Sequence, residues 1–372
     1  MGTRTVEVHV SFDYVPEPLL SQIAAVASAL PPRYYTQQQV FEELAKHWSA
    51  ELENPALLQR FHQRVGVDGR YFALPLEEYV EMERWGQFNA AWLRVAEELG
   101  EQAICRALDE AGLGKEQIGA LLTVTVTGVV SPSLDAHLCN RMGLPADVRR
   151  TPIFGLGCVA GASGIAQATD YVRAYPDKIA VLLSVELCSL TWQRRDLSIA
   201  NLIASGLFGD GAAAVIVAGD QVKLPKQAGP TVLATASSFY TNTEEAMGWD
   251  IGEEGFKIVL SPEVPAIIRE HLPQDLARFL AANGLRREQI TSWVLHTGGP
   301  KVLEAMADAA GVSREECALS WESLRKVGNL SSASVLFVLE DTIRERRPAP
   351  GSYGILAAMG PGFCSQLVLL RW

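Results

Sequence analysis

Apolar residues along this chain follow two patterns, which predict helices and buried strands in alternation. At 18–50 and 88–113 they recur every three or four residues among charged positions, which is the spacing of amphipathic helices. At 120–130, 179–187 and 212–219 they form short runs rich in Val, Ile, Leu and Ala. Runs of this kind are typical of strands buried on both faces. The pattern therefore predicts an α/β protein, with a further helix, rich in Ala and Gly, starting at Cys158.

The second part of the chain repeats this design. It predicts a strand, two helices and a closing strand pair around a Gly-Pro-Gly turn, at 292–299, 301–311, 331–347 and 351–372 respectively. The closing segment echoes LFGDGAAAVIVAG, which ends the first part. Two α/β halves that each end in a Gly-bounded strand indicate an internal duplication. We expect the halves to be 1–224 and 225–372, joined at PKQAGP.

Length and charge narrow the class of protein. A chain of 372 residues is too long for one small core, and its formal net charge of -11 disfavours nucleic acid as a partner. No run of about 18 apolar residues is present to span a membrane. The start, MGTRTVEVHVSFDYVPEP, reads as a strand and a Pro-containing loop without the apolar core of a signal peptide. We therefore expect a cytoplasmic protein with no membrane span.

The six cysteines are scattered and no two have CxxC spacing, so neither a structural zinc site nor any other metal site is expected. Cys158 stands apart from the rest because, in FGLGCVAGASG, it opens a predicted helix. The free N–H groups and positive dipole end of a helix N-terminus favour a thiolate. Flanking glycines let a bulky thioester approach the sulfur. Taken alone, the pattern fits a nucleophile or a buried structural cysteine.

Two other polar residues occupy similar places. His296 ends a predicted buried strand before TGGP, where a catalytic base or hydrogen-bond donor would stand. Asn329, in VGNLSSAS, begins a helix rich in small residues. Singly, each fits a structural role: a satisfied core histidine and an N-cap asparagine. With Cys158 they form a set at strand and loop ends, where α/β folds place their chemistry.

The phrases GCVAGASG, LFGDGAAAVIV, HTGGPKVLEA, GNLSSASVLFVLED and GPGF give the chain a family resemblance. In order and approximate spacing they resemble type III polyketide synthases, the chalcone synthase-like family, from about Val124 to the C-terminus. The resemblance implies a thiolase-like fold of five layers, αβαβα, in a homodimer. It also implies acyl-CoA and malonyl-CoA as substrates, with no cofactor beyond the CoA thioesters themselves.

By this resemblance Cys158 carries the acyl chain. His296 and Asn329 bind the thioester carbonyl and stabilise the enolate that malonyl-CoA leaves on losing carbon dioxide. An enolate oxygen needs hydrogen-bond donors in a dry site, and an Asn amide or an imidazole can supply them.

The same resemblance implies residues that shape the substrate cavity. Phe208 would be a gatekeeper between the CoA tunnel and the cavity, and Phe256 a second one. Substrate contacts would also come from the closing turn and from five motif positions: Gly360, Pro361, Gly362, Val126, Thr127, Ser131, Cys188 and Thr191. At Ser131 plant enzymes carry a larger residue that reaches across the dimer. Arg60 and Arg64 share one helix face and are candidates for the CoA phosphates, although they also fit a solvated basic surface.

The phrase TGVVSPSLDAHLCNRMGL resembles bacterial members that make alkylpyrones and alkylresorcinols from fatty acyl starters, which we take as the expected product class. ELCSLTWQ also resembles tetrahydroxynaphthalene synthases, but these typically carry a cysteine where Thr191 stands. The alternatives are therefore a tetrahydroxynaphthalene- or chalcone-like synthase, a ketosynthase III that condenses once, and an inactive thiolase-fold partner protein.

Overall fold

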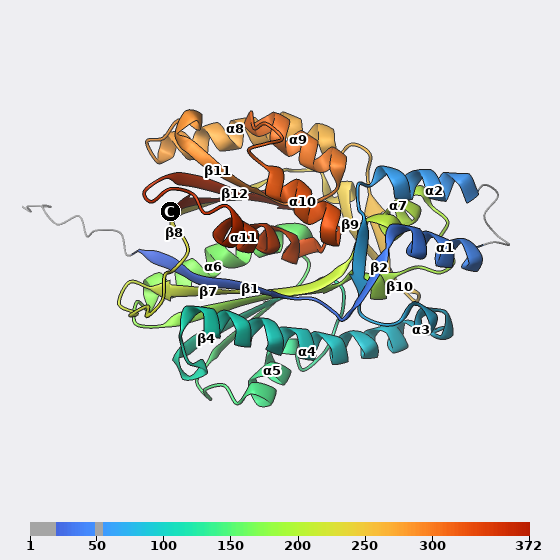
Figure 1. Ribbon diagram of the computed structural model, residues 1–372, viewed down its shortest axis with the longest axis horizontal. Coiled ribbons are helices and arrows are strands. Elements are labelled where there is room, and N and C mark those ends of the chain that lie inside the picture. The colour runs from blue at the N-terminus through green and yellow to red at the C-terminus, as the bar shows by residue number, and fades with distance from the viewer. Residues whose placement is uncertain (1–19, 49–54) are drawn as a thin grey trace, which may run out of the picture.

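In the computed structural model, residues 20–48 and 55–372 are described. They build five layers, helices and sheets in alternation, with α8 and α9 on one outer side and α4 and α5 on the other (Figure 1). The expected αβαβα architecture is therefore confirmed. The strand expected in MGTRTVEVHV lies outside the described residues. Within them, no helix is both long and apolar enough to cross a bilayer.

Nine strands follow one another in the order β11-β12-β13-β8-β1-β7-β6-β4-β5. The joint between β8 and β1 consists of only two residue pairs, Ser21–Val232 and Gln22–Thr231. The strands therefore divide at this joint into two stacked sheets that share a corner, one from each half of the chain.

The N-terminal sheet consists of β1 (Ser21–Ala29), β7 (Asp210–Gly219), β6 (Ile179–Leu187), β4 (Ile118–Val124) and β5 (Arg149–Ile153). Its outer face is covered by α4 (Trp85–Ala111) and α5 (Leu134–Met142). The C-terminal sheet consists of β8 (Thr231–Phe239), β13 (Cys364–Arg371), β12 (Tyr353–Gly360) and β11 (Ile290–Leu295). Its outer layer contains α8 (Val264–Ala282) and α9 (Pro300–Ala310). Between the sheets lie α6 (Ala160–Ala174) and α11 (Ser334–Glu345).

The remaining elements gather beyond one end of the sheets, on the right in Figure 1. They are α1 (Gln37–His47), α2 (Pro55–Arg64), α3 (Leu76–Glu81), α7 (Ile199–Leu207), the antiparallel strand pair β2 (Arg33–Thr36) and β3 (Gly69–Phe72), and the β9–β10 hairpin (Met247–Gly252, Gly255–Leu260). One further helix, α10 (Ala318–Val327), packs against α11 and β3. This end of the molecule holds the cavities described below.

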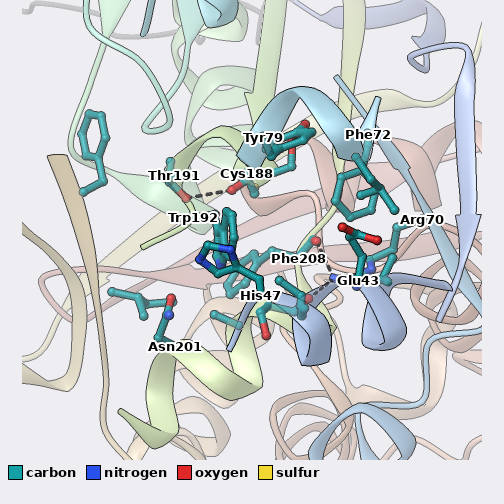
Figure 2. A pocket seen from close by; sticks show the side chains of 18 of the residues that line it. Glu43, His47, Arg70, Phe72, Tyr79, Cys188, Thr191, Trp192, Asn201 and Phe208 are labelled. Atoms are coloured by element: carbon teal, nitrogen blue, oxygen red, sulfur yellow. Dashed lines mark hydrogen bonds between the residues drawn. The ribbon is translucent and has the colours of Figure 1, made fainter. Parts of the chain in front are cut away.

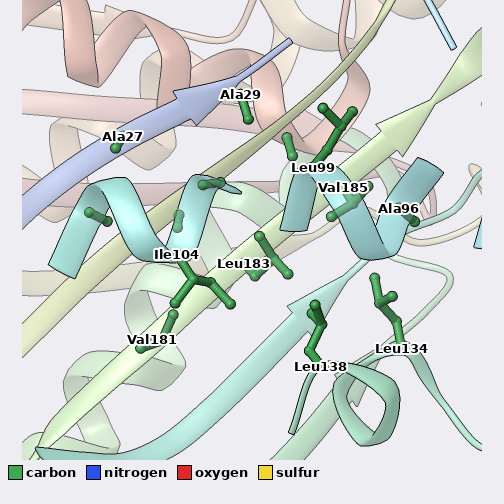
Figure 3. Packing of buried hydrophobic residues seen from close by; sticks show 14 of the residues in the cluster. Ala27, Ala29, Ala96, Leu99, Ile104, Leu134, Leu138, Val181, Leu183 and Val185 are labelled. Carbon is green, nitrogen blue, oxygen red and sulfur yellow. The ribbon is translucent and has the colours of Figure 1, made fainter. Parts of the chain in front are cut away.

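Most elements predicted from hydrophobic patterning are present, but the helix expected at 18–50 is wrong over its first part. Residues 21–29 form β1, and only 37–47 are helical. The segment SQIAAVASA is almost wholly buried, because β1 lies between α4 on one face and α11 on the other. Small apolar residues fit this two-sided burial, so packing overrides the helical spacing. Figure 3 shows Ala27 and Ala29 of β1 in the same buried cluster as Leu99 and Ile104 of α4.

Between the sheets, α6 and the short 3₁₀ helix η6 (Ser331–Ala333) approach very closely. The contact is made by Gly161, where any Cβ would collide with the carbonyl oxygen of Ser332. The small residues predicted at the start of α6 therefore have a packing role: they allow the two segments that carry Cys158 and Asn329 to come together.

Candidate active site

Cys158 lies in the 3₁₀ turn η2 (Gly157–Val159), which runs directly into α6. The turn is tight because Gly157 has a φ of 54°, and a Cβ at this position would lie 2.6 Å from Cδ of Pro361. This glycine therefore lets the closing Gly-Pro-Gly turn pack against the cysteine loop. The thiol is 6% exposed and donates to the hydroxyl of Ser331 over 3.6 Å.

His296 follows β11 and is held there by its backbone N–H, which donates to the carbonyl of Ala357 in β12 over 3.0 Å. Its side chain is 2% exposed. Among the described residues, its Nδ1 has no hydrogen-bond partner. The imidazole is thus fixed by backbone and packing, and its ring is left available to a substrate.

Asn329 is oriented by two hydrogen bonds to its side-chain oxygen. The backbone N–H of Ser331 donates to Oδ1 over 2.8 Å, and the hydroxyl of Ser334 donates over 3.2 Å. Because Oδ1 is occupied, the amide NH₂ is the group left to donate. Ser331 adopts φ of 49°, in the left-handed region that is costly for a non-glycine residue, so its place beside Cys158 is over-determined by its surroundings.

Both titratable groups of this set are electrically neutral at pH 7. Burial raises the pKa of the Cys158 thiol to about 12, with the hydrogen bond to Ser331 a smaller opposing effect. Burial also lowers the pKa of His296 to about 4. A neutral imidazole can take a proton from the thiol when the sulfur attacks, and in its resting state it can also donate a hydrogen bond.

Cys158, His296 and Asn329 line one cavity, which we call the catalytic cavity. Its other walls include Val126, Cys188, Phe208, Trp249, Ile258, Pro361 and Phe363. The structure thus brings together three residues that are separated by up to 171 positions in the chain. A second, mainly apolar cavity adjoins it, and Cys188, Phe208, Trp249 and Ile258 line both.

Figure 2 shows this adjoining cavity, with Thr191, Trp192, Phe72, Tyr79 and His47 around it. Phe208 therefore stands between two spaces, as a gate residue would. Phe256 lines the adjoining cavity and not the catalytic one, where Ile258, two residues along the same strand, takes its place. It is 1% exposed and packs against Trp85, Phe154 and Trp249.

The other predicted substrate residues divide into two groups. Val126, Cys188, Thr191 and Pro361 line one or both cavities. Gly360 and Gly362 lie in the closing turn, where Gly360 packs on the backbone of Leu156 and Val159. Thr127 is buried behind the catalytic cavity, where it donates to Glu186. Ser131 is exposed and lines neither of these two cavities, so its contact with substrate stays a prediction.

Arg60 and Arg64 are both exposed on α2. Arg64 lines a surface hollow with Pro300 of α9 and with Arg314. The hollow lies between the end of α2 and the start of α9, and Pro300 at the start of α9 is four residues after His296 in the sequence. The two arginines contribute positive charge to this hollow, whereas Arg60 lies outside the cavities described; binding of CoA by either predicted arginine stays a prediction.

Sequence reasoning missed two features of the site. Trp249 lines both cavities and is the bulkiest residue to do so. Glu186, at the end of β6, is fully buried and accepts hydrogen bonds from Val126 N–H, Thr127 and Ser332. Burial raises its pKa to about 7. The sequence feature that could have identified Glu186 is the presence of a single carboxylate in the otherwise apolar strand IAVLLSVEL. Across the described part of the chain, no cluster of potential ligands could hold a metal ion.

Comparison with known proteins gives matches over almost the whole chain. The family model "Chalcone and stilbene synthases, N-terminal domain" matches residues 20–221, and the corresponding C-terminal domain model matches 231–372. A 1,3,6,8-tetrahydroxynaphthalene synthase of Streptomyces peucetius subsp. caesius is 50% identical over 352 residues, which are 95% of this chain and 93% of the relative.

Two further comparisons widen the picture. An alpha-pyrone synthesis polyketide synthase-like protein of Mycobacterium tuberculosis is 33% identical over 259 residues, 69% of this chain and 66% of that one. The crystal structure of 1,3,6,8-tetrahydroxynaphthalene synthase from Streptomyces coelicolor, a bacterial type III polyketide synthase, superposes with a TM-score of 0.88 at 29% identity. It covers 94% of this chain and 99% of that structure.

Proposed function

This chain belongs to the chalcone and stilbene synthase family of type III polyketide synthases, and we propose that Cys158, His296 and Asn329 carry its chemistry. The family's activity is decarboxylative Claisen condensation, an acyl transfer that uses CoA thioesters and needs no cofactor. The observation that supports the proposal is that these three residues, far apart in sequence, line one buried cavity. The predicted recognition as a type III synthase is confirmed.

Priming begins when the sulfur of Cys158 attacks the carbonyl carbon of an acyl-CoA. Because the resting thiol is neutral, its proton must leave as the carbon–sulfur bond forms, and His296 is the neutral base in the cavity. The bond to CoA then breaks, and the proton returns from His296 to the departing CoA sulfur.

Extension begins when malonyl-CoA loses carbon dioxide and leaves an enolate. The electron pair of the broken carbon–carbon bond moves onto the thioester oxygen, to which the Asn329 NH₂ and an imidazole N–H of His296 donate. The enolate carbon then attacks the thioester on Cys158. The Cys158 sulfur is the leaving group of this attack, and the extended chain is now attached to CoA. Transfer of that chain back to Cys158 allows another round.

For the product, we favour a tetrahydroxynaphthalene built from malonyl units alone. This choice is supported by the Streptomyces peucetius synthase, which is 50% identical to this chain over 95% of its length. The cavity lining is consistent with it, because two large aromatic side chains, Trp249 and Phe208, stand at the boundary of the catalytic cavity. This reverses the order of preference drawn from the sequence, where Thr191 counted against the naphthalene branch.

An alkylpyrone from a fatty acyl starter is the second candidate, and the adjoining cavity favours it. That cavity is apolar and lined by Val40, Leu44, Leu76 and Val80, side chains suited to an alkyl chain. Trp249 and Phe208, with Cys188 and Ile258, line both this cavity and the one that holds Cys158. The choice between the two products therefore depends on whether this boundary opens.

We also propose a cytoplasmic homodimer. The strand β5 lies at the edge of the sheet and is mostly exposed, and Phe154 and Val129 near it are 49% and 45% exposed. Arg149, Arg150 and Pro152 discourage strand pairing along β5 itself, so we propose that the exposed apolar side chains of Phe154 and Val129 make the contact with a second chain. Ser131 lies on the loop between Val129 and α5, so this residue would lie near the proposed contact with a second copy.

The product is tested by incubating the enzyme with malonyl-CoA alone and with a series of acyl-CoA starters, followed by mass spectrometry. We expect a tetrahydroxynaphthalene from malonyl-CoA alone, and no product from Cys158→Ala. Pyrones that appear only with long acyl-CoA would establish the second candidate instead. A single-extension β-ketoacyl product would identify a ketosynthase III-like activity.

Trp249→Ala tests the boundary directly. Removing the indole joins the two cavities, so the variant should accept longer acyl starters than the wild type, by a preference of about 0.8 kcal/mol for each newly buried methylene. Ile251→Ala, in the same hairpin but 52% exposed, is the matched control and should leave the starter profile unchanged. An unaltered profile in a folded Trp249→Ala enzyme would show that the indole is no barrier.

A further inference from the structure

Arg70 is a buried cation beside the catalytic cavity whose role the mechanism leaves open. It lies in β3 and is 1% exposed. Its Nη1 donates to the backbone carbonyls of Ser205 and Phe208, both over 2.9 Å, and its Nη2 donates to Oε1 of Gln37 over 3.1 Å. Figure 2 shows the guanidinium next to Phe208 at the wall of the adjoining cavity.

The carbonyls that Arg70 binds belong to the C-terminal end of α7. Carbonyls in the last turn of a helix lack intrahelical donors and carry the negative end of the dipole, so a guanidinium fits there. Phe208 is the residue at which this helix ends, and its ring lines both cavities. Arg70 therefore fixes the backbone from which the gate side chain projects.

The same backbone segment is bonded to Asn329. The N–H of Asn329 donates to the carbonyl of Leu207 over 2.9 Å, and the N–H of Gly209 donates to the carbonyl of Asn329 over 3.0 Å. Phe208 and Asn329 thus face each other as an isolated β-bridge. A shift of the C-terminal end of α7 would therefore also shift Asn329, the residue proposed to bind the enolate.

The stem of Arg70 passes between these two segments. A Cβ on Gly328, which precedes Asn329, would lie 3.0 Å from Cδ of Arg70, and one on Gly209 would lie 3.4 Å from its Cβ. Gly328 also has a φ of 76°. The absence of a side chain at Gly328 therefore leaves room both for the Arg70 stem and for the carbonyl of Leu207, which a Cβ there would approach to 2.6 Å.

The groups facing the guanidinium keep it charged without pairing it directly to a carboxylate. Burial lowers the pKa of Arg70 to about 10, and the nearby charge of Asp210 opposes this shift. Asp210 accepts hydrogen bonds from Ala73 N–H and Ser189 N–H. The Phe72 ring lies 5.5 Å from the guanidinium carbon. Arg70 thus remains a cation at neutral pH whose three donated hydrogen bonds go to carbonyl and amide oxygens.

We propose that Arg70 is a positioning residue that holds Phe208 and Asn329 in one frame, so that decarboxylation of malonyl-CoA stays coupled to chain extension. The inference rests on the function proposed above for Cys158 and Asn329. If the frame loosens, the enolate forms out of line with the thioester on Cys158. It then takes a proton from water, so that malonyl-CoA and a proton give acetyl-CoA and carbon dioxide.

The test is Arg70→Lys, assayed for the ratio of acetyl-CoA released to polyketide formed from malonyl-CoA. Lysine keeps the charge, but it cannot reproduce the planar fork that bridges two carbonyls and Gln37. We expect the ratio to rise on the order of 10- to 10²-fold, the penalty of a displacement of about 1 Å in a reacting pair. Acylation of Cys158 by an acyl-CoA, read by intact mass, should persist.

Arg173→Lys is the matched control. Arg173, on α6, also donates from Nη2 to two backbone carbonyls, those of Val232 and Leu233, but it lies in none of the cavities described. It should lower the melting temperature while leaving the coupling ratio as in the wild type. A folded Arg70→Lys enzyme whose ratio stays within twofold of wild type would overturn the proposal, whatever its loss of stability.

If Arg70→Lys does not fold, Gln37→Met decides the matter. This change removes the acceptor of Nη2 and two bonds that the Gln37 amide donates, to Gly206 and His62 carbonyls. The coupling ratio should rise in the same direction, and a folded Gln37→Met enzyme with an unchanged ratio would count against the proposal. A wild type that forms no polyketide at all would instead refute the proposed function, so the two failures are distinguishable.

Discussion

At the scale of single residues, the catalytic cavity combines one hydrogen-bond donor that cannot titrate with two titratable groups that are neutral at rest. Asn329 cannot titrate, and its oxygen is bound by Ser331 and Ser334, so only its NH₂ is free to act. His296 and Cys158 are buried and neutral at rest. This arrangement suits a reaction in which negative charge appears only transiently, because no fixed charge has to be neutralised first.

Loss of either donor should slow condensation on the order of 10²–10³-fold, the size associated with one oxyanion-hole donor. His296→Ala removes the imidazole, and Asn329→Asp keeps the bonds to Oδ1 while replacing the NH₂ by a carboxylate oxygen. Initial rates of polyketide formation measure both effects. Acylation of Cys158 should survive in Asn329→Asp, and rates within a few-fold of wild type would remove that residue from the mechanism.

Glu186 should make stability depend on pH. Its pKa is raised from 4.5 to about 7 by burial, so the folded state binds this proton more tightly than the unfolded state does. The associated stability is fully present below about pH 4.5 and is lost as the pH rises through 7. Glu186→Gln cannot ionise. The difference in unfolding free energy between this variant and the wild type should therefore shift in favour of the variant by on the order of 3 kcal/mol from pH 5 to pH 8.

Urea unfolding of both proteins at several pH values measures this difference. Other titrating groups, such as Asp210, whose pKa burial raises to about 6, are common to both proteins and cancel in the comparison. A difference in unfolding free energy that is the same at pH 5 and pH 8 would mean that Glu186 does not titrate in this range.

At the scale of elements, the close approach of α6 and η6 determines whether the catalytic cavity forms. Cys158 lies in η2, which leads directly into α6, and Ser331 opens η6. The two are joined by the bond between the Cys158 thiol and the Ser331 hydroxyl. The distance between α6 and η6 therefore determines the distance between the nucleophile and the loop that carries Asn329.

Gly161→Ala should separate these elements. Its new Cβ would overlap the carbonyl oxygen of Ser332, so we expect a loss of about 1–3 kcal/mol in stability together with a loss of condensation rate. Gly86→Ala in α4, where a Cβ meets nothing within 4 Å, is the control and should stabilise by about 0.5 kcal/mol. Equal effects of the two changes would show that α6 has room to spare.

At the scale of the whole molecule, β5 leaves an edge of the sheet open in one chain. The edge is flanked by Phe154 and Val129, both well exposed. We expect the wild type to be a dimer in light scattering after gel filtration. Phe154→Lys with Val129→Lys should shift it toward monomer, because like charges would face each other across a symmetric contact.

Phe239→Lys is the control, since Phe239 is 62% exposed but belongs to β8 in the other half of the chain. It should leave the mass of the dimer unchanged. If the β5 variants remain dimeric and the Phe239 variant does not, the interface lies on the C-terminal half. A wild type that is a monomer at micromolar concentration would contradict the proposed homodimer.

Hydrophobic periodicity predicted an α/β protein of two similar halves, the family resemblance implied its five layers, and motif positions picked out the three residues that meet in the catalytic cavity. The buried strands β4, β6 and β7 and the helices α4, α6 and α9 follow from local patterns, because each needs only the repeat of its own side chains. Cys158, His296 and Asn329 could be selected because each lies where a predicted element begins or ends. The division of the chain at 224/225 stays a prediction, and 225–230 lies in the connection between β7 and β8.

What the sequence could not decide depends on contacts between distant segments. β1 has the spacing of a helix but is a strand, because α4 and α11 cover both its faces. Ile258, and not Phe256, lines the catalytic cavity because of the way the β9–β10 hairpin packs against the rest of the molecule. The same packing places Trp249 at both cavities. Arg70 and Glu186 acquire their roles only from burial beside segments more than a hundred residues away. Local sequence determines which elements form, whereas the stacking of two sheets decides which side chains share a space, because desolvation and close contact exist only in the assembled molecule.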